Sequence, residues 1–174
     1  MLLIQIASIT GLLLIFFQDV KERSVYWVAF PCLTVLFFSL RLLQLHAVME
    51  IFRTTVFNLL FIAIQILMIS LYFSIKNRAW INITDNHLGW GDVLFLLSIA
   101  CYLSILNFIV FYILSLTSVL VIWLMWRAII KTKNGQIPLA GLQALIFVSC
   151  LAISWWLIPV NLTTDDWLLN LMGK

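Results

Sequence analysis

Residues 93–126 read VLFLLSIACYLSILNFIVFYILSLTSVLVIWLMW, a run of 34 residues without one charged side chain. A single α-helix of this length would extend for about 50 Å, whereas the hydrocarbon core of a bilayer is only about 30 Å thick. The run therefore predicts two membrane-spanning helices, Val93–Leu106 and Phe108–Trp126, joined by a turn near Ser104–Asn107.

The rest of the chain has the same apolar character. Of its 174 residues, 64% are hydrophobic and only 10% are charged, which is too few charges for the surface of a soluble domain. We predict an all-α integral membrane protein, with residues 1–174 forming a single membrane-embedded domain. The bundle would have six transmembrane helices, or five if the central run is one span. The other four predicted spans are Met1–Phe17, Val25–Leu45, Thr55–Ile75 and Leu139–Ile158.

The basic residues predict the orientation of these spans. Seven of the ten Lys and Arg residues lie in the first, third and fifth loops, and only Arg41, Arg53 and Lys174 are assigned to the second loop and the tail. Because positive charge favours the cytoplasmic side, the N-terminus is predicted to lie outside. The seven are Lys21, Arg23, Lys76, Arg78, Arg127, Lys131 and Lys133.

Composition also excludes several classes of function. A net charge of +3, spread over short loops, does not predict nucleic-acid binding. Cys32, Cys101 and Cys150 lie singly inside apolar segments, so neither a zinc site nor a disulfide framework is indicated. We expect no metal and no cofactor.

Two acidic residues differ from the other five, which lie in loops or in the tail. Asp19 closely follows the first apolar segment, and Asp92 immediately precedes the run that starts at Val93. The predicted topology places both at the cytoplasmic edge of the membrane, where ionisable groups are costly and indicate function. Two neighbouring carboxyl groups can share one proton, so that one activates water while the other polarises a carbonyl. Asp19 and Asp92 are therefore the predicted catalytic pair.

Each of these residues also has a purely structural interpretation. Asp19 and Arg23 have the i, i+4 spacing of a helical ion pair. Asp92 follows a glycine and precedes an apolar helix, as an N-cap residue does.

Around Asp92 the chain reads Gly89-Trp90-Gly91-Asp92, which matches the G-x-G-D motif of membrane aspartyl proteases. The motif opens the fourth apolar segment, and an Asp stands at the end of the first. This arrangement resembles the type IV prepilin and archaeal preflagellin peptidases. Two further features agree with the family pattern: Arg23 and Val25 follow Asp19, and Ile137-Pro138-Leu139-Ala140 precedes the last span.

The resemblance implies an aspartic endopeptidase of the bacterial inner membrane. Its substrates would be prepilin-like precursors, whose leader peptide is cut at the cytoplasmic face, with Gly89, Trp90, Gly91 and Arg23 near the substrate. The chain has Tyr26-Trp27 where the family has Pro-Asn. It also lacks the N-terminal region with Cys-x-x-Cys pairs, so it resembles a short form without N-methylation activity.

Two alternatives belong to other functional classes. An inactive homologue would act in pilus or secretion assembly and would tolerate loss of either Asp. A small membrane transporter would need polar groups near the middle of the membrane, where Gln65 is the main polar side chain.

Overall fold

The computed structural model describes residues 1–44, 48–77, 89–130, 138–158 and 160–172. Within these ranges the chain is helical and contains no strand. A π-helical turn, η1 (Ile153–Leu157), directly continues α7. The α-helices are α1 (Leu2–Glu22), α2 (Ala29–Gln44), α3 (Val48–Asn77), α5 (Trp90–Ala100), α6 (Ile105–Ile130), α7 (Leu139–Ala152) and α8 (Asp166–Met172).

Among the residues that the structure describes, four helical segments are long and apolar enough to cross a membrane, which supports a multi-pass membrane protein. They are Leu2–Glu22, Val48–Lys76, Ile105–Met125 and Leu139–Leu157. Two further apolar helices, α2 and α5, are shorter than the spans predicted for them. The α3 helix extends beyond its predicted span at both ends.

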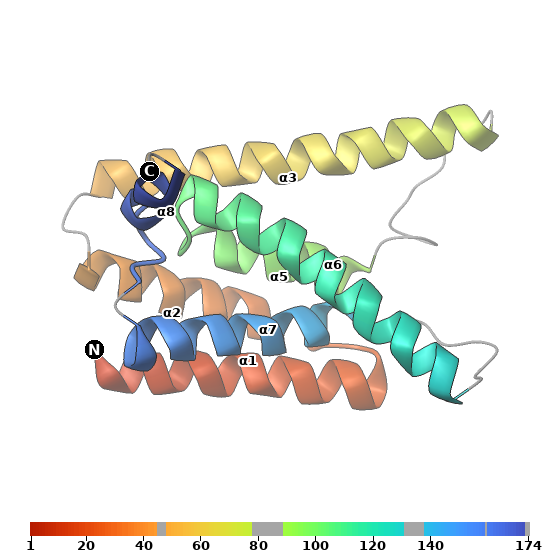
Figure 1. The fold of residues 1–174 in the computed structure, drawn as a ribbon, viewed down its shortest axis with the longest axis horizontal. Coiled ribbons are helices and arrows are strands. Elements are labelled where there is room, and N and C mark those ends of the chain that lie inside the picture. The colour runs from red at the N-terminus through yellow and green to blue at the C-terminus, as the bar shows by residue number, and fades with distance from the viewer. Residues whose placement is uncertain (45–47, 78–88, 131–137, 159, 173–174) are drawn as a thin grey trace.

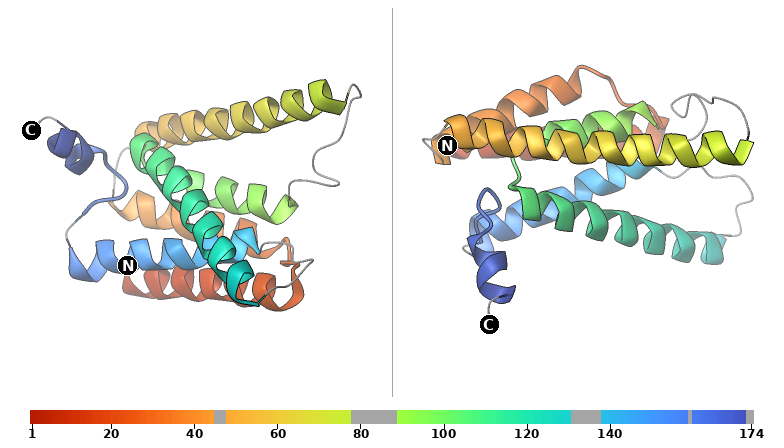
Figure 2. Two further views of the ribbon diagram at one scale, coloured as in Figure 1. Left: turned by 45° about the vertical axis from the view of Figure 1, so that its right-hand side comes forward. Right: turned by 90° about the horizontal axis from the view of Figure 1, so that it is seen from above.

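The apolar helices run alternately in opposite directions along the long axis of the molecule (Figure 1). The C-terminal ends of α1, α3 and α6 therefore lie at the same end as the N-terminal ends of α5 and α7. Met1 and α8 lie at the opposite end. The α6 helix crosses the bundle obliquely, and the C-terminal half of α3 extends beyond the neighbouring helices (Figure 2).

The central apolar run turns slightly earlier than predicted. Its first helix, α5, ends at Ala100, and the chain turns through Cys101–Ser104 rather than at Ser104–Asn107. Composition alone does not mark this position, because apolar residues continue on both sides of it. The turn depends on side chains from two other helices.

Arg41 of α2 and Asn58 of α3 cap the C-terminal end of α5. The Arg41 side chain is fully buried, and its Nη1 donates hydrogen bonds to the carbonyls of Cys101 (3.0 Å) and Leu103 (3.3 Å). Asn58 Nδ2 donates to the carbonyls of Ala100 and Leu103, both at 2.9 Å. These bonds satisfy carbonyl groups that a helix leaves free at its C-terminus. The assignment of Arg41 to the second loop was therefore wrong.

The structure describes only some of the other Lys and Arg residues that were used to predict the orientation of the spans. Arg53 also lies within a helix, on the exposed side of α3, rather than in the second loop. Lys21 and Lys76 lie in the last turns of α1 and α3, at the same end of the bundle. Outside the described residues lie Arg78, Lys131, Lys133, Ile137 and Lys174.

The C-terminal tail docks on the start of α6. The Asn107 Nδ2 atom donates hydrogen bonds to the carbonyls of Leu162 (3.1 Å) and Thr164 (2.9 Å), and Asn107 Oδ1 accepts one from Trp167 Nε1 (3.1 Å). The tail and the turn after α5 thus form one polar cluster.

Replacing Asn58 by leucine tests how α5 is held. We expect Asn58→Leu to lower the free energy of unfolding by about 1 to 2 kcal/mol, because the Ala100 carbonyl loses its side-chain donor in an apolar surrounding. Thermal unfolding in detergent measures the change. Thr117→Val is the matched control, since Thr117 is exposed and bonds only to carbonyls of its own helix. Equal melting temperatures for the two variants would contradict the capping role.

Candidate active site

Three helix ends meet at one end of the bundle, and two of them carry the predicted acids. Asp19 lies in the last turn of α1, and its Oδ2 accepts a hydrogen bond of 2.6 Å from the backbone N–H of Gly141. Gly141 is the third residue of α7, whose first N–H groups have no partner within their own helix. A side chain from the first helix thus caps the last apolar helix.

Asp92 occupies the third position of α5, after the N-cap residue Gly89. The backbone N–H groups of Gly89 and Ala140 lie close enough to its carboxylate to favour the ionised form. The Gly89 N–H is placed as in the reach-back half of a capping box. Asp92 is therefore not the N-cap residue itself, although it does help to cap the helix.

Consecutive backbone amides at the start of α7 thus face both carboxylates: the Gly141 N–H donates to Asp19, and the Ala140 N–H favours the ionised form of Asp92. The N-terminus of a helix also carries a partial positive charge, which favours negative groups placed beside it. Segments far apart in the sequence are joined here through main-chain atoms.

The two carboxyl groups interact electrostatically. Asp92 precedes the apolar run and lies outside the four candidate spans. Burial in the first place, and then the negative charge of Asp19, raise the pKa of Asp92 to about 6, although the N–H groups of Ala140 and Gly89 act in the opposite direction. A pair of carboxyl groups in this state shares one proton mainly below about pH 6.

Two glycines leave little room beside the carboxylates, and the constraint is stronger at Gly141 than at Gly89. A Cβ atom on Gly141 would lie 2.9 Å from Asp19 Cβ and 3.3 Å from the Phe16 carbonyl oxygen. A Cβ atom on Gly89 would lie 2.9 Å from Asp92 Oδ2. Gly91 is different, because a Cβ atom there would make only ordinary contacts of 3.9 and 4.0 Å.

The other two predicted site residues lie on the surface. Trp90 is 62% exposed, as expected of an indole at a membrane boundary. Arg23 is also exposed and ends α1 in the left-handed conformation (φ 52°), with its N–H donating to the Asp19 carbonyl. In the described part of the chain no ion pair links its guanidinium to Asp19, because the backbone leaves the helix at Arg23.

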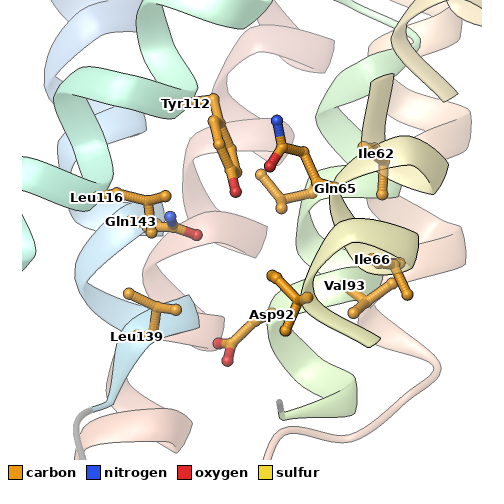
Figure 3. Close-up of a pocket in the computed structure, with 11 residues that line it drawn as sticks. Ile62, Gln65, Ile66, Asp92, Val93, Tyr112, Leu116, Leu139 and Gln143 are labelled. Carbon is orange, nitrogen blue, oxygen red and sulfur yellow. The ribbon is translucent and has the colours of Figure 1, made fainter. Parts of the chain in front are cut away.

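A small cavity adjoins Asp92 on the side facing α3 and α6 (Figure 3). Its walls are mostly aliphatic, but polar side chains of Gln65, Tyr112 and Gln143 also line it. Sequence reasoning noted Gln65 only as an isolated polar residue and did not identify Tyr112 or Gln143. It also missed the Ala140 and Gly141 amides: Pro138 indicated the start of a helix but not which side chains would meet its first N–H groups.

No third potential metal ligand joins the two acids: the described residues contain no group of three His, Cys, Asp or Glu side chains placed to hold a metal ion. Within the described residues the site therefore consists of two carboxyl groups, two main-chain N–H groups and a largely apolar cavity.

No protein-family model matches the chain, and neither the curated proteins nor the solved structures yield a match.

Proposed function

We propose that this protein is a membrane aspartic endopeptidase that cleaves the leader peptide of type IV pilin-like precursors. The observation that carries the proposal is the pairing of Asp19 and Asp92 on consecutive amides of α7. The G-x-G-D sequence at 89–92 and the position of Asp19 at the end of the first helix support the same class.

In the proposed mechanism, the pair holds one proton and binds the hydrolytic water. The ionised carboxylate removes a proton from this water, which attacks the scissile carbonyl, while the protonated carboxyl donates to the carbonyl oxygen. The amides of Ala140 and Gly141 hold the two side chains in place, so that little reorganisation is needed as charge moves between them.

The proposed setting is the bacterial inner membrane. Six spans, with α2 and α5 as the shorter ones and the N-terminus outside, would place Asp19 and Asp92 at the cytoplasmic face. A substrate with a basic leader followed by an apolar helix would lie partly in the bilayer, with the junction between the two presented to the acids.

A processing assay tests the proposal. The protein, reconstituted in liposomes, is mixed with synthetic peptides that carry a short Lys-rich leader and a 20-residue apolar helix, and the products are identified by mass spectrometry. Wild type is expected to cut at the junction, and Asp19→Asn and Asp92→Asn are expected not to. If both variants cleave the peptide as well as wild type does, Asp19 and Asp92 are not the catalytic pair. If wild type binds the peptide without cleaving it, the result would favour an inert assembly factor.

The raised pKa of Asp92 predicts the pH dependence of the reaction. Because this carboxyl must be protonated to donate to the substrate carbonyl, kcat/KM should fall as the pH rises through about 6, approaching a tenfold loss per pH unit. Initial rates in liposomes buffered from pH 4 to 9 measure the profile. A rate that stays constant from pH 5 to 9 would contradict the role given to Asp92.

A further inference from the structure

The cavity beside Asp92 has a volume of about 60 Å³ and is formed by four helices: α3, α5, α6 and α7. Aliphatic side chains such as Ile66, Leu116 and Leu139 make up most of its wall, and Asp92 lies at one end (Figure 3). A peptide bond held between the two acids would therefore have an apolar space next to it.

Gln143 provides an unused hydrogen-bond acceptor in this wall. Its side chain is only 1% exposed, and its Nε2 donates to Ser115 Oγ (3.3 Å). The Ser115 hydroxyl donates its proton to the Tyr112 carbonyl (3.1 Å), so Ser115 can only accept from Gln143, which fixes the orientation of the amide. None of the described residues donates to Gln143 Oε1.

The free oxygen faces the cavity, and Figure 3 shows the Tyr112 hydroxyl and the Gln65 amide directed into the same space. A buried polar atom without a partner is costly, by about 1 to 3 kcal/mol, and calls for an explanation. The cavity opens onto a pair of acids, so a hydrogen-bond donor from a bound peptide would explain the free oxygen.

We propose that the cavity is a substrate subsite, which receives one aliphatic side chain next to the scissile bond while Gln143 Oε1 accepts a hydrogen bond from a main-chain N–H of the substrate. This inference rests on the proposed peptidase function. The substrate helix must unwind before its carbonyl can reach the acids, and a main-chain N–H freed beside this largely apolar cavity needs a new acceptor.

The size of the cavity restricts the side chain. Benzene enters an engineered apolar cavity of about 150 Å³, and one water needs only about 10–15 Å³. A cavity of about 60 Å³ therefore has room for a small or branched aliphatic group but not for an aromatic ring. The subsite is thus predicted to accept Ala or Val and to reject Phe.

Gln143→Met tests the acceptor, because methionine has a similar shape but offers no amide oxygen. We expect KM for the leader peptide to rise about tenfold, with kcat changed less than about twofold, since the lost bond is present before and during the reaction. Gln5→Met, a similar exchange at the far end of α1, is the control and should keep wild-type constants. An unchanged KM for Gln143→Met would overturn the role of the acceptor.

Leu116→Ala tests the fit by enlarging the cavity. Peptides carrying Val or Phe at each position around the cleaved bond are compared. At one position wild type should prefer Val, and Leu116→Ala should reduce that preference at least about tenfold. Leu145→Ala, which removes an exposed leucine of α7, should leave the preference unchanged. If no position responds to the larger cavity, the subsite assignment is wrong.

Cross-linking separates this inference from the proposed function. Leader peptides carrying photo-leucine at single positions are bound to Asp19→Asn and irradiated, and adducts are mapped by mass spectrometry. Adducts on Ile66, Leu116 or Leu139 support the subsite whether or not wild type cleaves the peptide. Cleavage by wild type together with adducts only outside the cavity would reject the subsite and leave the peptidase proposal intact.

Discussion

Asp92→Asn is expected to lower the rate of peptide cleavage by at least about a thousandfold and, at the same time, to stabilise the folded protein at neutral pH. The rate falls because asparagine can neither hold nor share the proton of the pair. The stability rises because burial and the charge of Asp19 make an ionised Asp92 unfavourable in the folded state.

The direction of the stability effect follows from the two pKa values. In the unfolded chain Asp92 ionises near 3.8, whereas in the folded protein it ionises at about 6. The folded state thus binds the proton more tightly, and its stability decreases as the pH rises from about 4 to 6. Above pH 6 the ionised Asp92 lowers the free energy of unfolding by on the order of 3 kcal/mol at most. Removing this charge in Asp92→Asn should therefore raise the melting temperature by roughly 5 to 10 °C.

Thermal unfolding of wild type and Asp92→Asn at pH 4 and pH 8 measures this effect. The variant should melt higher at pH 8, and the difference should largely vanish at pH 4, where Asp92 of the folded wild type is protonated and therefore uncharged, like asparagine. Asp166→Asn is the control, since Asp166 is exposed in α8, far from the dyad. A lower melting temperature for Asp92→Asn at pH 8 would mean that its main-chain hydrogen bonds outweigh its burial.

Gly141→Ala is expected to lower kcat/KM about a hundredfold, although it adds only one methyl group. That group would lie 2.9 Å from Asp19 Cβ and 3.0 Å from Oδ2. Neither the Asp19 Cβ nor the Phe16 carbonyl on the other side can move without moving α1, so Asp19 must shift and its bond to the Gly141 amide is lost. A displacement of about 1 Å at a catalytic group is enough for a loss of this size.

Gly11→Ala is the matched control for this variant. A Cβ atom on Gly11 would lie 3.0 Å from Leu33 Cδ2, the mobile end of a side chain between α1 and α2. It should destabilise the bundle to a similar or smaller extent, by about 1 to 3 kcal/mol, but leave kcat/KM within a few fold of wild type. If both variants lose activity equally, general loosening of the bundle would explain the result, and Gly141 would have no special role.

The helical class and most helix positions could be predicted from the sequence, because a continuous apolar run determines where a chain can enter lipid. Val93–Trp126 was too long for one span, and a turn was expected within it; α5 and α6 are indeed separate helices. The length of α5 could not be predicted, since Ala100 and Cys101 resemble their neighbours in hydrophobicity. The helix ends there because Arg41 and Asn58, distant in sequence, bind its last carbonyls.

The candidate site was also predictable only in part. Asp19 and Asp92 could be singled out as acids at the edges of apolar segments. The groups that hold them could not, because the donors are main-chain N–H groups of Ala140 and Gly141, which every residue except proline possesses. Likewise, the free oxygen of Gln143 depends on where Ser115 and Tyr112 lie in a neighbouring helix, and helical periodicity in an almost wholly apolar segment carries little information about this.

Because α5 ends early, its first turn lies closer to the turn after Ala100 than it would in a helix of full length. Eleven residues rise about 16 Å, roughly half of a 30 Å hydrocarbon layer, so a helix of full length would set its first turn much farther toward the water. Arg41 and Asn58 supply the donors that the last carbonyls of α5 lack, so the chain can turn back after only eleven residues. Two side chains at one end of α5 therefore decide where along the bundle the other end, with Asp92, begins.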